Sequence, residues 1–301
     1  MKKEKLYLEI INVLKDGVYF VDQERRITFW NNAAEEITGY SRDEIVGVKC
    51  QDTMLNHIDH DGCNLCEVGC PLYATVIDGV QRTGDVFVRH KDGHRIPIKV
   101  NMFPIYENGE IVGGVEVFAQ SSPVVYDDDL IEDLATSASA DRLTGLPNRR
   151  SLETFLEFKL SEATRFGRKF CVVFLDLDNF GSFNKNYGHA VGDAVLKAVG
   201  GSIMHTIRNT DMFGRWGGEE FLGIFEVKQD HEATLISEKI RVLISKSEVV
   251  VDDDGNKASI SASLGATVVR DDDTLITIVK RADELMQQSK QKGKNRVSFS
   301  S

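Results

Sequence analysis

The sequence has no apolar run long enough to cross a membrane and no surplus of basic residues. A membrane-spanning helix needs about 18 consecutive apolar residues, and no run in the chain reaches that length. The stretch MKKEKLYLEIINVL is interrupted by Glu4 and Glu9 and has no small-residue cleavage site after it, so it predicts an amphipathic helix and not a signal peptide. A net charge of −11 argues against general nucleic-acid binding, which needs a basic surface. We therefore expect a cytoplasmic protein with no membrane span and no nucleic-acid partner.

Cysteine is also scarce, with five in 301 residues. In a cytoplasmic protein these thiols are expected to be free, redox-active or metal-binding, and not disulfide-bonded. Cys50, Cys63, Cys66 and Cys70 form the pattern C-x12-C-x2-C-x3-C, which could hold zinc or an iron–sulfur cluster, or act as a thiol redox switch. The pattern is equally compatible with free thiols in a helix-rich insertion. Cys171 lies in an apolar run, where packing explains it.

The length of the chain favours two domains, and the first is predicted to be rich in short strands. A helix is expected over residues 31–38, ended by Gly39. Polar turns such as Lys91-Asp92-Gly93 separate the strand-like runs. This half therefore predicts an antiparallel sheet of about five strands with helices inserted in its middle. The strands are expected at 17–22, 26–30, 86–90, 96–104 and 111–119.

Two stretches of this half resemble PAS sensor domains. They are GVYFVDQERRITFWNNAAEEITGYSRDEIVG at 17–47 and FVRHKDGHRIPIKVNMFPI at 87–105. The resemblance implies a PAS domain over residues 1–120, with an α+β fold. It also implies either a cavity for a small molecule or a dimerisation surface, and it does not require the cysteines.

Residues 121–140, SSPVVYDDDLIEDLATSASA, join the two halves. Pro123 breaks the preceding sheet, and Leu130 and Leu134 are spaced as on one face of a helix. The segment is either a short helical stalk that carries a signal or an ordinary acidic linker, because it is too short for a diagnostic heptad repeat.

In the second half, residues 141–301, helical and strand-like patterns alternate. This alternation predicts an α+β sheet covered by helices, with no internal repeat. The helices are expected at 149–166, 190–207, 232–245 and 275–290. The strands are expected at 171–175, 212–216, 221–227, 259–269 and 296–299.

Acidic residues follow the most apolar of these strands, in the run Leu175-Asp176-Leu177-Asp178. Carboxylates at a strand end suit Mg²⁺, although a D-x-D pair alone is as readily a solvated strand end. The turn Gly217-Gly218-Glu219-Glu220 strengthens the metal interpretation, because neighbouring strands would bring Glu219 close to Asp176. The two glycines would leave room for a ligand.

The residues after Asp178 predict an anion site. Asn179, Phe180 and Gly181 follow the strand and open a helical turn, whose first backbone N–H groups are free to bind phosphate. Asn184 and Asp193 would then be placed to read a base, since a carboxylate accepts two N–H groups from the guanine edge.

Five motifs in this half resemble the GGDEF domain, the catalytic domain of diguanylate cyclases. They are DRLTGLPNRR (141–150), LDLDNFGSFNKNYGHAVGDAVL (175–196), RWGGEEF (215–221), SASLGAT (261–267) and ADELMQQSKQKGKNRV (282–297). The resemblance implies a mostly antiparallel, palm-like sheet flanked by helices. It also implies a homodimer that condenses two GTP into cyclic di-GMP and two pyrophosphates, with two Mg²⁺ or Mn²⁺ ions in each active site.

The roles of the family carry over to positions of this sequence. The resemblance implies metal binding by Asp176, the Leu177 carbonyl and Glu219, with Glu219 also helping to deprotonate the attacking 3′-hydroxyl. Asp178 either assists or is structural. The resemblance also implies that the helix start and the lysines bind the phosphates of GTP, and that Asn184 and Asp193 bind its guanine. The full set implied to bind GTP is Asn179, Phe180, Gly181, Asn184, Asp193, Gly217, Gly218, Lys290 and Lys294.

Arg208 and Asp211 form an R-x-x-D pair just before the GGEEF motif. At this position the resemblance implies an inhibitory site for the product, and the alternative is a surface ion pair. Two residues depart from the family: Gly181 stands where Lys is common, and Lys294 stands where Arg is common. Both changes concern phosphate affinity and not the type of reaction.

Two rival functions remain. The first is a non-catalytic receptor for GTP or cyclic di-GMP, against which the intact set of Asp176, Glu219, Asn184 and Asp193 argues. The second is a synthase of mixed cyclic dinucleotides, against which Asp193 argues because it favours guanine. In the enzyme interpretation, a PAS signal would pass through 121–140 and 141–150 and change how two GGDEF domains meet.

Overall fold

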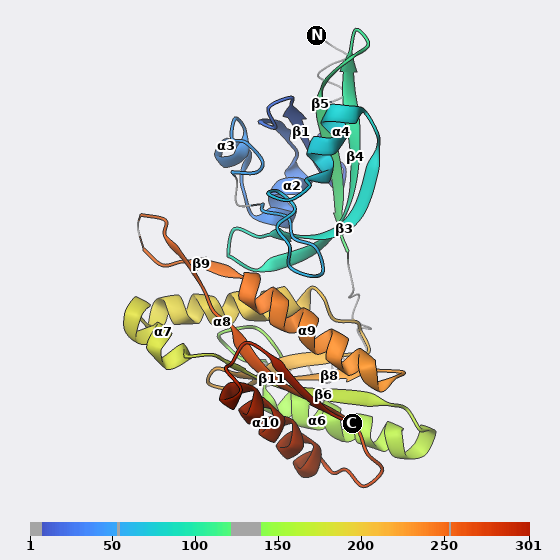
Figure 1. Ribbon diagram of the computed structural model, residues 1–301, viewed down its shortest axis with the longest axis vertical. Coiled ribbons are helices and arrows are strands. Elements are labelled where there is room, and N and C mark those ends of the chain that lie inside the picture. Colours follow the sequence, from blue (N-terminus) through green and yellow to red (C-terminus); the bar gives the residue numbers. More distant parts are fainter. Residues whose placement is uncertain (1–7, 53–54, 122–139, 253) are drawn as a thin grey trace. The chain divides into compact units, whose positions relative to one another are not determined.

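The computed structural model describes residues 8–52, 55–121, 140–252 and 254–301, and the chain divides into two compact units, Met1–Ser122 and Pro123–Ser301 (Figure 1). The predicted linker at 121–140 falls almost wholly outside the described residues, so its character stays a prediction. No helix of the described residues is long and apolar enough to cross a membrane.

The N-terminal unit is built on a five-stranded antiparallel sheet in the order β2-β1-β5-β4-β3, which confirms the predicted fold class. The three later strands are longer than predicted, because β3, β4 and β5 pair along almost their whole lengths. The strands are β1 (Gly17–Asp22), β2 (Ile27–Trp30), β3 (Arg82–Arg89), β4 (Arg95–Glu107) and β5 (Glu110–Gln120).

Three short helices of this unit, α2 (Asn32–Thr38), α3 (Arg42–Ile45) and α4 (Pro71–Asp78), lie between β2 and β3 in the sequence (Figure 1). Asn31 precedes the predicted helix as its N-cap, since its side chain accepts a hydrogen bond from the Ala34 N–H at 2.9 Å. Gly39 ends α2 in the left-handed conformation, as predicted.

The four cysteines of the C-x12-C-x2-C-x3-C pattern differ in their exposure. Cys50 is buried, Cys66 and Cys70 are half-buried, and Cys63 is exposed on a turn held by Asp59, whose carboxylate accepts the Cys63 N–H at 2.9 Å. Among the described residues, no group of three or more His, Cys, Asp or Glu is placed to hold a metal. Burial also raises the pKa of the Cys66 thiol to about 11, which disfavours the thiolate that a metal needs. The metal, redox and free-thiol interpretations of these cysteines all stay predictions.

The C-terminal unit has a five-stranded sheet in the order β12-β11-β6-β8-β7. All neighbouring strands are antiparallel except β11 and β12, which are parallel. The single strand predicted at 259–269 is two strands in the structure. The first belongs to a small two-stranded sheet, and the second belongs to the main sheet. The strands are β6 (Phe170–Leu177), β7 (Met212–Gly217), β8 (Glu220–Glu226), β9 (Glu248–Val250), β10 (Lys257–Ser259), β11 (Ala262–Val268) and β12 (Val297–Ser300).

Helices cover both faces of this sheet, as Figure 1 shows. Alternate residues of β6 explain the two layers: Val173 and Leu175 pack with α8 and α9, whereas Val172 and Phe174 pack with α6 and α10. All eight residues of β6 are consequently buried, which makes it the central strand. The helices are α6 (Arg149–Phe166), α7 (Phe180–Tyr187), α8 (His189–Met204), α9 (Asp230–Lys246) and α10 (Leu275–Gln291).

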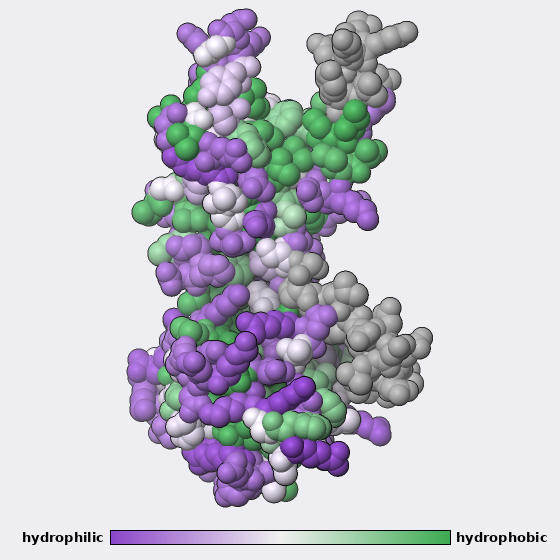
Figure 2. Space-filling model, turned by 90° about the vertical axis from the view of Figure 1, so that its right-hand side faces the viewer, coloured by the Kyte–Doolittle hydropathy of each residue, from purple (hydrophilic) through white to green (hydrophobic). Residues whose placement is uncertain are grey.

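The surface of the C-terminal unit is mainly hydrophilic on the face that Figure 2 shows, in keeping with the net charge of −11. Larger hydrophobic areas are visible on the N-terminal unit. Its exposed apolar side chains include Val68, Tyr73, Ile77, Val80 and Tyr106.

Candidate functional site

A cleft of about 330 Å³ opens where the central strand β6 ends and α7 begins. The buried strand delivers its last residues to the surface there, and Asn179, with φ 58°, turns the chain into the helix. The cleft is lined by Asp176, Leu177, Asp178, Asn179, Phe180, Gly181, Ser182, Lys185, Glu219, Lys290 and Lys294.

Glu219 reaches this cleft from the β7–β8 hairpin. Gly218 and Glu219 form the two-residue turn, and Gly218 has φ 53°, a conformation that favours glycine. β8 pairs with β6 so that Glu220 faces Asp176, and the Leu177 N–H donates to the Glu219 carbonyl at 3.3 Å. The structure therefore brings Glu219 to the end of the strand that carries Asp176. Side chains at Gly217 and Gly218 would meet open space, which leaves the turn accessible to a ligand.

Asp176 is a buried acid in need of positive charge. It is 7% exposed, and the Lys290 Nζ lies 2.7 Å from its Oδ2 atom. Burial raises the pKa of Asp176 above its ordinary value; Lys290 lowers it, but Glu219 and Asp178 raise it further. Burial and Asp176 likewise raise the pKa of Glu220. A cation that entered this cleft would stabilise the ionised form of these carboxylates.

The oxygen donors present fit a magnesium ion. Asp176 and Glu219 supply two carboxylates, and the Leu177 backbone lines the same cleft. Within the described residues no preformed cage of three or more acidic, His or Cys side chains surrounds a metal position. Mg²⁺ suits such an open arrangement, because it is commonly held by one or two carboxylates together with substrate phosphates and water.

Asp178 anchors the cleft and does not line it as a free acid. Its carboxylate accepts hydrogen bonds from the Ser261 hydroxyl at 2.7 Å, the Ser263 hydroxyl at 2.6 Å and the Asn295 N–H at 3.0 Å. Asp178 thereby ties the end of β6 to β11 and to the loop that follows α10. Of the two roles that the sequence left open for Asp178, these contacts support the structural one.

Replacing Asp178 with Ala is expected to lower the free energy of unfolding by about 3 kcal/mol, because three donors would lose a charged acceptor at a buried position. Urea unfolding of the C-terminal unit in the full chain measures this loss. Asp272→Ala, at an exposed turn, is the matched control. Equal stability of the two variants would contradict the anchoring role.

The start of α7 lies where the sequence predicts an anion site. The N–H groups of Ser182 and Phe183 donate to the Asn179 carbonyl, whereas those of Phe180 and Gly181 precede the first intrahelical bonds. The Lys294 ammonium contacts the Asn179 side chain, so a cation lies beside this helix start. Gly181 is exposed, and a Cβ there would meet nothing within 4 Å, so the lysine that the family often has would fit.

Asn184 and Asp193 lie outside the residues that line the cleft, on α7 and α8 respectively. The Asn184 Oδ1 atom is buried and has no hydrogen-bond partner among the residues that the structure describes. It packs against Gly192, where a Cβ atom would come within 1.9 Å of it. Asp193 follows Gly192 and is exposed. The two predicted base-reading residues are therefore neighbours, and Gly192, which sequence reasoning missed, makes the space for Asn184.

Arg208 and Asp211 belong to a separate pocket of about 130 Å³. The Asp211 carboxylate accepts the Glu226 N–H at 3.0 Å and the Arg208 N–H at 3.2 Å, so it organises the turn. Lys239 on α9 also lines this pocket, and burial, with a smaller effect of Arg208, lowers its pKa. Sequence reasoning missed Lys239, since only the packing of α9 brings it to the pair.

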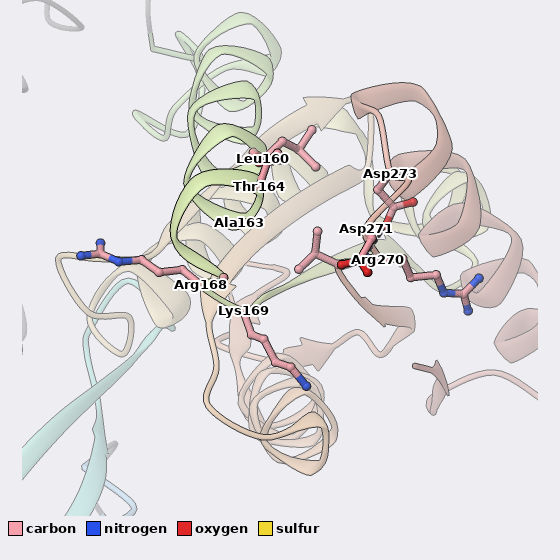
Figure 3. A pocket seen from close by; sticks show the side chains of 10 residues that line it. Leu160, Ala163, Thr164, Arg168, Lys169, Arg270, Asp271 and Asp273 are labelled. Carbon is pink, nitrogen blue, oxygen red and sulfur yellow. Dashed lines mark hydrogen bonds between the residues drawn. The ribbon is translucent and has the colours of Figure 1, made fainter.

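Another cavity, of about 400 Å³, lies elsewhere, at the end of α6 and the loop after β11 (Figure 3). The side chains of Arg168, Lys169 and Arg270 point in different directions there and do not converge on a ligand. Arg168 pairs with Glu162 at 2.8 Å, and Lys169 pairs with Asp230 at 3.2 Å. The charges of this cavity are thus used within the fold, and none of the predicted site residues lines it.

A further contact links the hairpin to the start of the C-terminal unit. The Asp141 carboxylate accepts from Arg215 Nη1 at 3.1 Å, and Arg215 Nε donates to the Gly218 carbonyl at 2.9 Å. Although burial raises the pKa of Asp141, hydrogen bonds from Thr144 and Arg215 lower it below its ordinary value. Asp141 therefore connects the region just after the linker to the hairpin tip that carries Glu219.

Comparisons with known proteins agree with this geometry. The family described as "Diguanylate cyclase, GGDEF domain" matches residues 138–296, and a PAS domain family matches residues 15–119. A probable diguanylate cyclase of Escherichia coli, DgcE, is 27% identical over 299 residues, which are 99% of this chain and 26% of that protein. The diguanylate cyclase DgcP of Pseudomonas aeruginosa is 31% identical over 167 residues, 56% of this chain and 25% of that protein. The chain thus spans about a quarter of the length of these curated relatives.

Solved structures support the same assignment. The GGDEF domain of DgcB from Caulobacter crescentus, in complex with c-di-GMP, is 30% identical with a TM-score of 0.52, and covers 55% of this chain and 94% of that one. The diguanylate cyclase SiaD of Pseudomonas aeruginosa, in complex with its activator SiaC, is 32% identical with a TM-score of 0.53, and covers 57% of this chain and 66% of that one. Family match, fold and cleft together show that the chain belongs to the GGDEF diguanylate cyclase family and carries a PAS domain before its GGDEF domain.

Proposed function

We propose that the protein is a cytoplasmic, Mg²⁺-dependent diguanylate cyclase that condenses two GTP into cyclic di-GMP and releases two pyrophosphates. The observation that carries this proposal is the cleft itself, where Asp176, Glu219 and the start of α7 meet Lys290 and Lys294. A buried and a half-buried carboxylate next to free N–H groups and two lysines suit a metal-bound triphosphate, and few other ligands need all three.

In this proposal the triphosphate lies along the start of α7. The N–H groups of Phe180 and Gly181 bind phosphate oxygens, and Lys294 contacts the terminal phosphates. Asp176, Glu219 and the Leu177 carbonyl would hold Mg²⁺, which would supply positive charge to the phosphates and to the departing pyrophosphate. Lys290, whose Nζ atom lies 2.7 Å from Asp176, would also bind the phosphates at this edge of the cleft.

Each new bond forms between a 3′-oxygen and the α-phosphorus of the other GTP. The 3′-hydroxyl loses its proton to Glu219, its oxygen bonds to phosphorus, and the bond to pyrophosphate breaks. Two such steps close the ring. One cleft holds one GTP, so two clefts must face each other, and we therefore propose a homodimer as the active form. Positioning the two nucleotides supplies much of the rate.

Guanine recognition is assigned to Asn184 and Asp193. The Asp193 carboxylate accepts two N–H groups from the guanine edge, which adenine does not offer. Asn184 has a buried Oδ1 atom without a partner, and a base with a donor at this position would remove that cost. This arrangement favours GTP over ATP at both halves of the dimer.

The pocket of Arg208, Asp211 and Lys239 is proposed to bind the product and inhibit the enzyme. Arg208 and Lys239 supply two cations for phosphate, and Ile236, Ile240 and Phe225 supply apolar surface for a base. Because the Asp211 carboxylate already accepts two backbone N–H groups, its main role is to hold Arg208 in place.

We also propose that the PAS domain regulates the cyclase through the contact of Asp141 with Arg215. Replacing Asp141 with Asn should reduce the initial cyclase rate about tenfold, because a weaker contact loosens the hairpin tip by roughly 1.4 kcal/mol. Initial rates of GTP consumption measure the effect. Glu153→Gln, which removes the exposed pair of Glu153 with Arg149, is the control. If both variants keep the wild-type rate, Asp141 does not position the tip.

Pyrophosphate release separates the enzyme from a non-catalytic receptor. The purified chain with GTP and Mg²⁺ is expected to release pyrophosphate in proportion to time. A receptor would bind GTP in equilibrium dialysis and release none. The same assay with ATP tests the guanine assignment, and release from ATP at an equal rate would refute it.

A further inference from the structure

Glu116 occupies a core position of the PAS sheet. The alternation of β5 places Gly114, Glu116 and Phe118 on one face, and the side chain of Glu116 is 1% exposed. In the sheet its partners are Tyr19 on β1 and Met102 on β4. An apolar residue would be expected at such a position, so packing alone does not explain this carboxyl group.

The carboxyl group faces a very small cavity. Neither Glu116 oxygen has a hydrogen-bond partner among the described residues, and the His57 Nε2 atom lies 3.6 Å from Oε1. The cavity measures about 10 Å³, which is at most about enough for one water molecule. It is lined by Tyr19, Cys50, His57, Leu65, Cys66, Cys70, Pro71, Leu72, Val86, Met102 and Glu116.

Burial decides the charge of the groups in this cavity. Burial raises the pKa of Glu116 to about 8. The Tyr19 hydroxyl lowers this pKa, but its effect is smaller than that of burial. Burial, with a contribution from Arg95, lowers the pKa of His57 to about 4. Near neutral pH a protonated carboxyl group therefore faces a neutral imidazole.

Tyr19, Cys50 and Cys66, which also face Glu116, keep one protonation state in this pH range. Burial raises the pKa of Tyr19 and of Cys50 far above neutrality, and that of Cys66 to about 11. Arg25 lowers the pKa of the Cys50 and Cys66 thiols slightly, and Arg95 acts on His57. Cys70, at the start of α4, also lines the cavity.

We propose that Glu116 is a proton-binding site through which the PAS domain senses pH and changes the cyclase rate. The regulatory part rests on the proposed cyclase function. An ionised Glu116 needs hydrogen-bond donors or water, and the closed cavity provides neither in sufficient number. Loss of the proton must therefore be accompanied by a local rearrangement that admits water.

The segment 55–70 is the part of the cavity wall best able to move. β1, β4 and β5 are held by continuous strand pairing, so the sheet side of the cavity is rigid. The segment carries His57, Cys66 and Cys70. It is joined to the sheet near its start, where Ile58 exchanges backbone hydrogen bonds with Phe87 at 3.0 and 2.8 Å, and the carbonyls of Leu55 and Asn56 accept from the Arg89 N–H and the Arg95 side chain. Its displacement opens the cavity without breaking the sheet.

Infrared spectroscopy of the full chain labelled with isotopic glutamate tests proton binding without any variant. A protonated glutamate band should be present near pH 6 and disappear with a midpoint near pH 8, and this band should be absent from Glu116→Gln. Glu110→Gln, at an exposed position of the same strand, should retain it. If Glu116 is already ionised at pH 6, so that wild type and Glu116→Gln show the same band, the proposal is overturned.

Enzyme assays test the regulatory part. The ratio of the cyclase rates of wild type and Glu116→Gln is expected to change about twofold or more between pH 6.5 and 9, with the same midpoint as the infrared band. Glu110→Gln should show a constant ratio. A titrating band with a constant rate ratio in Glu116→Gln would overturn the regulatory part. A titrating band in a chain that releases no pyrophosphate would instead refute the cyclase function and leave the proton site intact.

Discussion

Replacing Glu219 with Gln is expected to reduce cyclic di-GMP synthesis by about a thousandfold or more. Gln keeps the size of the side chain at the tip of the β7–β8 turn, so the fold should be preserved. It removes one of the two carboxylates proposed to hold Mg²⁺ and the group proposed to accept the proton of the 3′-hydroxyl. The rate is measured as product formed from GTP per unit time, and thermal unfolding of the same samples checks the fold.

Glu226→Gln is the matched control for this variant. Glu219 lies in the turn just before β8, and Glu226 lies at the far end of β8. It pairs with Lys159 at 3.4 Å and lies away from the residues that line the cleft. We expect it to keep the wild-type rate. If Glu219→Gln remained as active as Glu226→Gln, the assignment of metal binding and proton transfer to Glu219 would have to be abandoned.

Replacing Arg208 with Ala is expected to raise the concentration of cyclic di-GMP needed for half inhibition about tenfold or more, because a charge-assisted contact to phosphate is lost. The rate without added product should not change, since Arg208 is exposed and lies outside the cleft. Initial rates at increasing concentrations of added product measure the effect. Asp211 is a less suitable target, because its carboxylate also supports the backbone of Glu226.

Arg168→Ala is the control for charge, as Arg168 is a surface arginine of the same unit that pairs with Glu162. It should be inhibited like the wild type. Inhibition of Arg208→Ala at the wild-type product concentration would remove the regulatory role of this pocket. The R-x-x-D motif would then be a structural turn, held together by the two backbone hydrogen bonds to Asp211.

The features that the sequence predicted well are those determined by local patterns. The apolar run before Asp176 predicted a central strand, and the structure shows β6 buried on both faces. The glycines before Glu219 predicted a tight turn, and Gly218 adopts the positive φ that such a turn needs. Long motifs with fixed order identified the family. Strand and helix ends were less accurate, because pairing extends β6 to Leu177 and the helix expected to reach Ile207 ends at Met204.

The features that the sequence could not predict depend on side chains that meet across the fold. The cysteine spacing left metal binding, a redox switch and free thiols open, and only the structure shows that Cys50 is buried whereas Cys63 is exposed. Nothing in the chain near Asp178 indicates that Ser261 and Ser263 bind it. The same holds for Lys239, which α9 brings to the pocket of Arg208.

Polar residues inside apolar patterns were a signal that could have been used. Glu116 interrupts the alternating run GVEVF, and its burial without hydrogen-bond partners is visible only in the structure. Its neighbour across the cavity, His57, is 59 residues away in the sequence. No local pattern reports such a pairing.

Chromatography of the products formed from GTP and Mg²⁺ tests the central claim most directly. The purified full chain is assayed over a range of concentrations that includes a dimeric state confirmed by light scattering. We predict cyclic di-GMP as the product, with a rate per chain that rises as dimers form and then levels off. If a confirmed dimer made no cyclic di-GMP at any concentration, the protein would not be a diguanylate cyclase.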